Sequence, residues 1–329
     1  MKNILISGGA GYIGSSIANL LIEKKYKVTI IDNLSNGYKR LIPKKATFYK
    51  YDIADTKKIK MILKNSKYDF LIHLAALIKV EESVLFPKKY FNNNVIKSRI
   101  FLKTCLENGL DNIIFSSTAT VYKSEKKLLS ENSKVRPKSP YAKNKVEIEK
   151  FLKKFTRKTK KKIFILRYFN VVGAYKNLKT GQISKKSTHL FKILSEYIIG
   201  KRKKFFVNGN NFTTNDGTAV RDFIDINDLC LIHLLIIKHS KKLKSTIFNC
   251  GYGKGLSVMS IFLTAKKIFP NISFFMKDRR KGDPESLVAN VKRLKKLLNF
   301  KPKFNDIKKS ILSSVKWEEK INKKKYYLN

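Results

Sequence analysis

The stretch that decides the fold is Gly8-Gly9-Ala10-Gly11-Tyr12-Ile13-Gly14, which follows a short apolar run and opens a segment of helical periodicity. Its glycines recur at spacings of three residues. The missing side chains allow a tight turn and let backbone N–H groups approach a pyrophosphate, while the helix N-terminus favours an anion. In this strand–loop–helix context the motif predicts a dinucleotide-binding loop made of Gly8, Gly11, Tyr12, Ile13 and Gly14.

Short β-branched or aromatic runs alternate with longer helical segments through the first half of the chain, which is typical of βαβ units. The expected strands are Asn3–Ser7, Val28–Ile31, Thr47–Tyr51, Phe70–Leu74, Ile113–Ser116 and Ile163–Arg167. The expected helices between them are Ile13–Lys24, Lys57–Lys64, Asn92–Asn108 and Tyr141–Thr159. This pattern predicts an α/β fold, a Rossmann-type doubly wound parallel sheet with a smaller C-terminal α/β substrate-binding region.

The alternation weakens after about residue 175, where a polar stretch from 208 to 217 interrupts the pattern. We therefore expect a dinucleotide-binding Rossmann domain over residues 1–175 and a substrate-binding region over residues 176–329. Some segments of the second part, such as 220–240, could pack back on the first domain. Helices are expected near Leu190–Ile199, Asp228–His239, Ser257–Ile268 and Val291–Leu298.

The formal charge of +47 over 329 residues is the most unusual global feature, and alone it would suggest a polyanionic partner. The lysines occur in short clusters from end to end rather than in one stripe. No RRM, KH or C2H2 zinc-finger pattern accompanies them. We interpret the charge as a biased composition and expect no specific nucleic-acid partner.

Cysteine usage and hydropathy indicate the cellular compartment of the protein. Cys105, Cys230 and Cys250 fit neither a disulfide framework nor a metal-ligand spacing, so no metal is expected. The first apolar run is too short for a signal-peptide core, and no apolar stretch approaches the roughly 18 residues of a membrane span. These features favour a cytoplasmic protein without a membrane partner.

Two acidic residues end the second and third expected strands. Asp32 is suitably placed downstream of the glycine loop to bind a ribose diol, and it favours NAD over NADP because a carboxylate repels a 2′-phosphate. Asn33 joins the predicted cofactor contacts, although Asp32 before Asn33 also fits an ordinary turn. Asp52 and Ile53 are candidates for holding the adenine, with capping of the strand end as the other role open to Asp52.

A tyrosine and a lysine follow a helix start in Ser139-Pro140-Tyr141-Ala142-Lys143-Asn144-Lys145. Tyr141 and Lys145 are four residues apart and therefore lie on one helix face. Free tyrosine has a pKa of about 10, too high for a good base at neutral pH. A neighbouring ammonium group and a positive nicotinamide ring would both favour the phenolate, so we expect Tyr141 to accept a hydroxyl proton.

The stretch 115–122 supports this interpretation. It leads from an expected strand into hydroxyl residues at the carboxyl edge of the sheet, where open α/β folds bind ligands. Thr118 can donate to a substrate hydroxyl and relay its proton. A tyrosine and a lysine at this spacing also fit a plain helix surface, but the convergence of the glycine loop, Thr118 and the Tyr/Lys helix favours catalysis.

The sequence resembles the extended short-chain dehydrogenase/reductase superfamily and, within it, most closely the UDP-glucose 4-epimerase family. The similarity runs nearly end to end, through GGAGYIGS, DNLSNG, NNNV, FSSTATVY, SPYAKNK, RYFNVVGA, NDGTAVRDFIDINDL and RRKGDP. GxxGxxG and YxxxK are typical of the whole superfamily, whereas RYFN with DGTxVRDFI is more specific to the epimerases. The resemblance implies a UDP-sugar substrate, tightly bound NAD, a 4-keto intermediate and a homodimer formed through 92–108 and 141–159.

The resemblance also implies residue roles. Tyr141 would be the general base and acid, Lys145 its electrostatic partner and a ribose ligand, and Thr118 the hydroxyl relay. Further implied contacts are Asn94 and Phe169 for the cofactor, Asn170, His189 and Leu190 near the sugar and diphosphate, Phe205, Phe206 and Val207 beside the uracil, Arg221 and Arg280 on the diphosphate, and Asp283 on the nucleotide ribose. The family often has Asn where His189 stands.

Four alternatives share this scaffold. Dehydratases of this scaffold have an aspartate and a glutamate where Ala119 and Thr120 stand, and decarboxylases commonly keep the glutamate. Neither carboxylate is present here. An epimerase of N-acetylated or pentose UDP-sugars is open, since Leu287 is smaller than the tyrosine that some family members have. A noncatalytic NAD-binding protein would be favoured by loss of Tyr141 or Lys145, and both are present.

Overall fold

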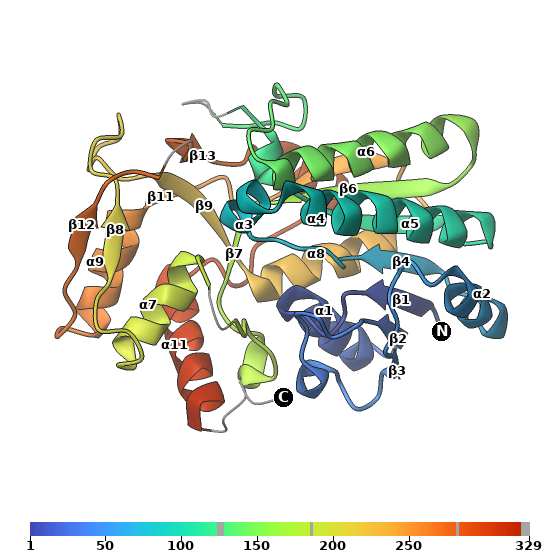
Figure 1. Ribbon diagram of the computed structural model, residues 1–329, viewed down its shortest axis with the longest axis horizontal. Coiled ribbons are helices and arrows are strands. Elements are labelled where there is room, and N and C mark those ends of the chain that lie inside the picture. Colours follow the sequence, from blue (N-terminus) through green and yellow to red (C-terminus); the bar gives the residue numbers. More distant parts are fainter. Residues whose placement is uncertain (124–127, 185–186, 281–282, 324–329) are drawn as a thin grey trace. The chain divides into compact units, whose positions relative to one another are not determined.

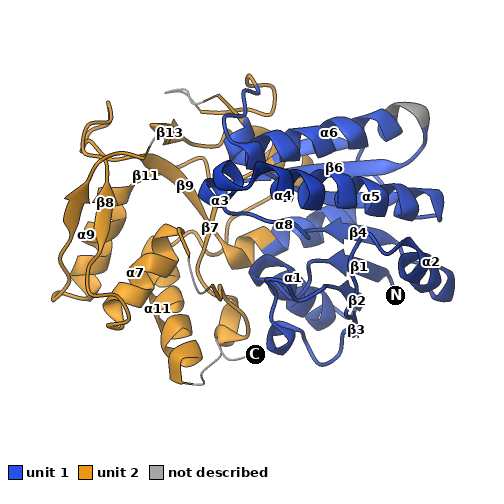
Figure 2. Ribbon diagram, in the orientation of Figure 1, with its two compact units in different colours: residues 1–121, 135–168, 230–248 blue, residues 122–134, 169–229, 249–329 orange. Residues whose placement is uncertain are grey.

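The structure, a computed structural model, describes residues 1–123, 128–184, 187–280 and 283–323 (Figure 1). The chain divides into two compact units (Figure 2). Unit 1 comprises residues 1–121, 135–168 and 230–248, and unit 2 comprises residues 122–134, 169–229 and 249–329. In the described part of the chain no helix is both long and apolar enough to cross a membrane.

Unit 1 is built on a seven-stranded sheet with the order β10-β6-β5-β4-β1-β2-β3. Along this order, each pair of neighbouring strands from β6 across the sheet to β3 is parallel. The order runs outward from β1 in both directions, so the topological switch point lies between β1 and β4. This confirms the predicted doubly wound α/β fold. The strands are β1 (Asn3–Ser7), β2 (Lys27–Ile31), β3 (Thr47–Tyr49), β4 (Phe70–His73), β5 (Asn112–Thr118), β6 (Lys162–Tyr168) and β10 (Thr246–Cys250).

Helices connect these strands. They are α1 (Tyr12–Glu23), α2 (Thr56–Asn65), α3 (Val80–Leu85), α4 (Pro87–Phe91), α5 (Ser98–Glu107), α6 (Pro140–Lys158) and α8 (Ile226–His239), with short 3-10 turns at η1 (Lys39–Leu41) and η3 (Ala119–Val121). The expected helix 92–108 begins instead with a π-helix, η2 (Asn92–Lys97), before α5. Such wide turns often mark functional sites. The short helices α3 and α4 were not predicted, because neither is long enough to show a clear period.

The core of unit 1 explains why its strands read as apolar runs. Side chains from α2, α5 and α6 form one buried cluster with residues of the sheet, including Leu71, Phe115 and Ile163. A parallel sheet covered by helices on its faces leaves little room for polar residues in its central strands. The packed sheet therefore holds the carboxyl ends of β1, β2, β4 and β5 in fixed positions.

Unit 2 contains two small sheets and a helical layer. A four-stranded sheet is formed by β7 (Asn170–Val172), β9 (Val220–Asp225), β11 (Gly255–Ser257) and β13 (Ser286–Leu287), and β8 (Phe206–Asn208) pairs with β12 (Phe275–Lys277). The helices are η4 (Lys176–Leu178), α7 (Leu190–Ile198), α9 (Val258–Ile268), α10 (Lys292–Leu298) and α11 (Ile307–Lys323). Apolar residues of α7, α9 and α11 form its core with β8 and β9.

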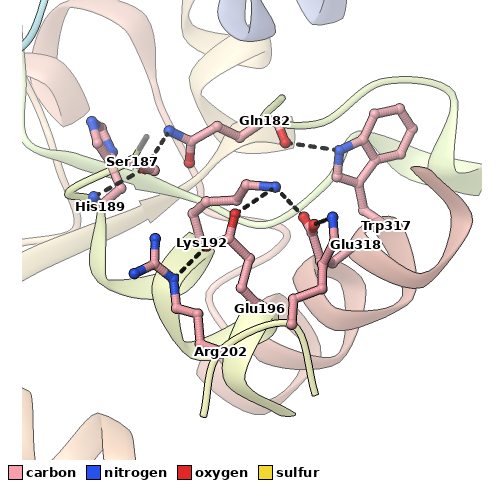
Figure 3. A network of polar contacts seen from close by, with 9 residues as sticks. Gln182, Ser187, His189, Lys192, Glu196, Arg202, Trp317 and Glu318 are labelled. Carbon is pink, nitrogen blue, oxygen red and sulfur yellow. Dashed lines mark hydrogen bonds and ion pairs between the residues drawn. The ribbon is translucent and has the colours of Figure 1, made fainter. Parts of the chain in front are cut away.

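A buried charge cluster joins α7 to α11 (Figure 3). The ammonium group of Lys192 contacts the carboxylate of Glu318 and lies 3.4 Å from that of Glu196. Lys201 and Arg202 supply further positive charge to Glu318 and Glu196 respectively. Removal of one of these carboxylates would leave the buried Lys192 ammonium group with one counter-charge fewer, which is destabilising. The cluster therefore fixes the start of α7 relative to the C-terminal helix.

A neutral histidine lies inside the sheet of unit 1. His73 Nδ1 is 2.6 Å from Ser7 Oγ, and His73 Nε2 is 3.1 Å from Ser98 Oγ. Its ring stacks against Phe115 and lies beside Phe101. Burial, with a smaller contribution from the positive charge of Lys145, lowers the pKa of His73 to about 3. The folded protein therefore keeps this imidazole uncharged down to acidic pH.

We predict a pH-dependent loss of stability from His73. Unfolded histidine has a pKa of about 6.5, so between pH 6.5 and pH 3 the unfolded chain binds a proton that the native chain excludes. The contribution is fully present above pH 6.5 and declines by up to about 1.4 kcal/mol per pH unit below it. Urea unfolding of wild type and His73→Gln should give a stability difference that narrows from pH 7.5 to pH 5. An equal difference at both pH values would contradict this account.

Candidate active site

The glycine loop after β1 forms a cradle that side chains would fill. A Cβ on Gly8, whose φ is +76°, would lie 2.6 Å from the backbone nitrogen of Ala75, and one on Gly14 would lie 2.3 Å from Gly8 O. At Gly11 a Cβ would meet only Gly8 O, at 3.4 Å. Gly11 is also the N-cap of α1 and offers no side-chain cap. The start of an α-helix favours an anion, so the loop before Tyr12 and Ile13 fits a pyrophosphate.

Asp32 ends β2 beside this loop. Its carboxylate accepts hydrogen bonds from Ala10 N at 3.0 Å and from Leu34 N at 2.8 Å. Burial raises the pKa of Asp32, and the two backbone donors oppose that rise. The carboxylate therefore ties the glycine loop to the turn after β2.

Asp52 carries a link that sequence reasoning missed. Its carboxylate forms an ion pair with Lys97 at 2.6 Å and accepts from Asn33 Nδ2 at 3.3 Å and from Ala54 N at 2.9 Å. Burial raises the pKa of Asp52, but the bonds to Lys97, Ala54 and Asn33 outweigh it and lower the pKa. The Ile53 side chain packs into the core of unit 1. No pattern in the sequence links Lys97 to Asp52, because the two residues are 45 positions apart and meet only in the folded unit.

Asn94 is buried in the π-helix and fastens the loop after β4. Its side chain donates to Leu77 O at 2.8 Å and accepts from Leu77 N at 2.8 Å. This paired contact fixes the segment that follows the switch point between β1 and β4. Asn94 would therefore act on a cofactor partly by fixing the shape of this loop.

Strand β5 and helix α6 bring Thr118, Tyr141 and Lys145 together. Ser139 caps α6 by accepting from Ala142 N at 3.2 Å, and Pro140 occupies the first turn. The Lys145 ammonium donates to Ser116 O at 2.7 Å and lies 6.0 Å from the centre of the Tyr141 ring. The Thr118 side chain lies close enough to Tyr141 to lower the pKa of its phenol. These contacts place a hydroxyl relay, a phenol and an ammonium group at one edge of the sheet.

The expected pKa of the tyrosine requires a correction. Burial raises the pKa of Tyr141 to about 12, against a lowering by the Thr118 side chain. Burial also lowers the pKa of Lys145 to about 7, against the opposing charge of Glu149. The prediction that Lys145 helps bring Tyr141 towards neutrality is therefore wrong for the chain alone. Desolvation penalises the charged form of each group and is the largest influence on both pKa values.

In unit 2 an arginine and an aspartate expected at the substrate lie together. Arg221 Nη2 forms an ion pair with Asp283 Oδ1 at 2.6 Å, and Arg221 Nη1 donates to Val220 O at 2.8 Å. Burial lowers the pKa of Arg221, Asp283 opposes this, and the charge of Arg280 adds to the lowering. Arg280 is exposed. The three residues thus form one polar group with an excess of positive charge.

The residues predicted beside the uracil do not share one surface. Phe205 and Val207 are fully buried in the core of unit 2, because alternate residues of β8 point to opposite faces. Phe206 is half-buried on the other face, with Lys277 Nζ 4.1 Å from its ring centre and the Phe275 ring 5.8 Å away. Only Phe206 of the three presents its side chain away from the core.

The remaining expected contacts lie at element ends. Phe169 is buried just before β7, and Asn170, the first residue of β7, is exposed. His189 is the exposed N-cap of α7, which begins at Leu190, and His189 N donates to Ser187 Oγ at 3.1 Å. Figure 3 shows how this segment connects through Gln182, whose carbonyl accepts from Trp317 Nε1 at 3.0 Å.

Two alanine substitutions in the glycine loop should separate cofactor retention from folding. Gly14→Ala forces a clash with Gly8 O, so we predict loss of both thermal stability and bound NAD. Gly11→Ala meets only an ordinary contact in the chain alone and should keep the fold. It should lose NAD, because its methyl group would occupy the side of the loop that we expect to hold the pyrophosphate. Absorbance of nucleotide released by denaturation and thermal melting measure the two effects. Wild-type NAD content in Gly11→Ala would refute the placement of the pyrophosphate at Gly11.

Three comparisons with known proteins agree with this geometry. Residues 4–251 match the model of the NAD dependent epimerase/dehydratase family. The UDP-glucose 4-epimerase of Lactobacillus helveticus is 36% identical over 96% of this chain and 97% of its own. The UDP-glucose 4-epimerase structure from Bifidobacterium longum in complex with NAD+ and UDP is 30% identical, with a TM-score of 0.91 over 97% of this chain and 98% of that one.

A further solved structure is similar to a comparable extent. The UDP-Glc/GlcNAc 4-epimerase from Campylobacter jejuni is 36% identical, with a TM-score of 0.84 over 97% of this chain and 100% of that one. The matches extend over both compact units, and the family model includes the glycine loop and the Tyr141/Lys145 helix. The chain therefore belongs to the NAD dependent epimerase/dehydratase family.

Proposed function

We propose that this chain is an NAD-dependent UDP-glucose 4-epimerase, which interconverts UDP-galactose and UDP-glucose through a 4-keto sugar. The observation that carries the proposal is the meeting of Thr118, Tyr141 and Lys145 at the carboxyl edge of β5. Family membership and relatives named as UDP-glucose 4-epimerases support it. The similar structure from Bifidobacterium longum, solved with NAD+ and UDP, supports NAD as the cofactor and UDP as the nucleotide.

The residues present fit NAD. The open side of the loop at Gly11 and the uncapped start of α1 would hold the pyrophosphate, and Asp32 would accept from the adenosine ribose. When bound, NAD would supply the hydride acceptor and donor and the positive charge of its nicotinamide ring. Asp52, Ile53 and Asn94 would shape the adenine and loop sides of the same site.

The chain's own residues would move the hydroxyl proton. Tyr141 accepts the proton of the C4 hydroxyl, with Thr118 as relay, and returns it after the sugar has turned over. Since burial holds the Tyr141 pKa at about 12 in the chain alone, ionisation of the phenol requires both Lys145 and a further positive charge. Arg221, Arg280 and Asp283 would hold the nucleotide end so that the hexose can rotate.

The two parts of the chain would then divide the work. In this proposal residues 1–175 bind NAD and residues 176–329 bind the nucleotide sugar. The glycine loop and the Tyr141/Lys145 helix belong to unit 1, and the Arg221/Asp283 pair belongs to unit 2. Residues 230–239 of α8 cluster with unit 1, consistent with a segment of 220–240 that packs back. The three cysteines are buried and form no disulfide, which supports a cytoplasmic, reducing location.

Conversion of UDP-galactose without added cofactor tests the activity. Purified protein is expected to produce UDP-glucose, followed by NMR of the anomeric protons, because NAD should copurify. Tyr141→Phe should lower kcat by at least about 100-fold, since it removes the group that accepts the proton. The variant should retain the fold, and its NAD content serves as the control.

Unchanged UDP-galactose, even with NAD+ added, would contradict the assignment to plain UDP-hexoses. N-acetylated and pentose UDP-sugars would then be tested, because the relatives include the Campylobacter jejuni UDP-Glc/GlcNAc 4-epimerase and a putative UDP-arabinose 4-epimerase from Arabidopsis thaliana. Leu287, which lies opposite Arg221 in the β13–β9 pair, is the smaller residue that would leave room for an acetamido group.

We also propose a homodimer through the helical layer of 92–108 and 141–159. Ile96 and Ile100, one turn apart around η2 and α5, are 39% and 37% exposed, and Phe91 at the end of α4 is 46% exposed. Such grouped apolar residues on a surface indicate an interface.

The double variant Ile96→Glu/Ile100→Glu should sediment as a 38.1 kDa monomer, whereas wild type sediments at twice that mass. Leu263→Glu, at an apolar site on α9 that is 49% exposed, is the control, and a monomeric wild type would refute the interface.

A further inference from the structure

A buried ion pair in unit 1 includes Glu149, which lies on α6 one turn after Lys145. The Arg167 guanidinium donates to both oxygens of Glu149, from Nε to Oε1 at 3.0 Å and from Nη2 to Oε2 at 2.6 Å. Ser117 Oγ donates to Glu149 Oε1 at 2.6 Å. Glu149, Arg167 and Ser117 are 2%, 1% and 2% exposed. A charge so far from water persists only with partners of this quality.

The position of Glu149 connects this ion pair to the proposed catalytic group. Tyr141, Lys145 and Glu149 follow one another at intervals of four residues, so all three lie on one face of α6. On β5, Ser117 stands between Ser116, whose carbonyl accepts from Lys145, and Thr118. Glu149 thus contacts the strand that carries the relay and belongs to the helix that carries the base.

Few charges act on the Lys145 ammonium group. His73 on β4 stays neutral, and Tyr141 on α6 is protonated in the chain alone. Among the described residues, the charge that acts on Lys145 is that of Glu149 on α6, and Arg167 on β6 is paired with Glu149. The carboxylate of Glu149 opposes the effect of burial and raises the pKa of Lys145, which burial has lowered to about 7. At neutral pH a modest change in this field decides whether Lys145 carries its charge.

We propose that Glu149 is a positioning residue for catalysis: its buried carboxylate, anchored by Arg167 and Ser117, keeps Lys145 charged and holds α6 against β5. This inference rests on the proposed epimerase function. It differs from a purely structural role, in which the Glu149/Arg167 pair would stabilise the packing of α6 on β6 without influence on Lys145. The two roles predict different responses to pH.

The first test is Glu149→Gln in the full-length protein with its bound NAD. Loss of the carboxylate lowers the pKa of Lys145 by about one unit or more, so the alkaline limb of kcat should move to lower pH by a similar amount. kcat at pH 8 should fall by about 10-fold or more, because deprotonated Lys145 no longer assists the phenol. KM for UDP-galactose should change little, since Glu149 is buried in unit 1 and the proposed nucleotide residues belong to unit 2.

A second readout does not depend on turnover. In protein labelled with 15N-lysine, the Lys145 Nζ signal, assigned by its absence in Lys145→Met, should titrate at lower pH in Glu149→Gln than in wild type. Glu147→Gln is the matched control, because Glu147 lies on the same helix but pairs with Arg99 and Lys150 nearer the surface. It should leave the Lys145 titration and the pH profile unchanged.

Two further variants cover a failure to fold. Glu149→Gln leaves Arg167 unpaired in the core, whereas Glu149→Gln/Arg167→Met removes both charges and should recover thermal stability. The double variant should still titrate Lys145 at lower pH. Glu149→Asp keeps the carboxylate and should restore the pH profile even if its melting temperature is lower.

The outcomes separate the alternatives. Wild-type titration of Lys145 and an unshifted pH profile in Glu149→Gln and in the double variant, with only a lower melting temperature, would overturn the proposal and leave a structural ion pair. Inactive wild-type protein would instead refute the proposed function, while the Lys145 titration would still report on Glu149.

Discussion

The hydrogen bond from Lys145 to the Ser116 carbonyl, at 2.7 Å, is the contact on which the candidate site depends. It joins helix α6 to the end of strand β5, and it is made by an ammonium group with almost no access to water. Through it, Tyr141 on the helix is brought to Thr118 on the strand. The parallel sheet below supplies the rigidity that such a site requires, because its strands are buried on one face by α2, α5 and α6.

Burial creates an electrostatic conflict at this contact. It raises the Tyr141 pKa and lowers the Lys145 pKa, so the chain alone favours a neutral phenol and a marginally charged amine. Proton transfer from a sugar hydroxyl needs the opposite balance. Positive charge brought by NAD and negative charge fixed at Glu149 act on the two members of the pair in the required directions. The proposed chemistry thus couples base strength to cofactor binding, so that the phenol ionises only when hydride can also be accepted.

Much of the fold could be predicted from local patterns. The glycine spacing, the apolar strands and the Tyr/Lys interval are all short-range features, and the observed strand ends differ from the expected ones by two residues or fewer. The substrate side was harder to predict because β8 is a strand: Phe205 and Val207 enter the core, whereas Phe206 faces away. Glu149 was missed because it lies among charged neighbours in VEIEK and looks like a solvated helix face. Its partner Arg167 comes from a distant strand, and the desolvation that decides the Tyr141 pKa is a property of packing.

The most direct test of the account uses UDP-galactose with deuterium at C4, incubated with the purified protein in ordinary water. The account predicts UDP-glucose that retains the deuterium at C4, because the hydride removed from that carbon is returned to it while only the hydroxyl proton passes through Tyr141. Loss of the label to solvent would contradict oxidation and reduction at C4. Absence of any UDP-glucose would contradict the proposed function itself.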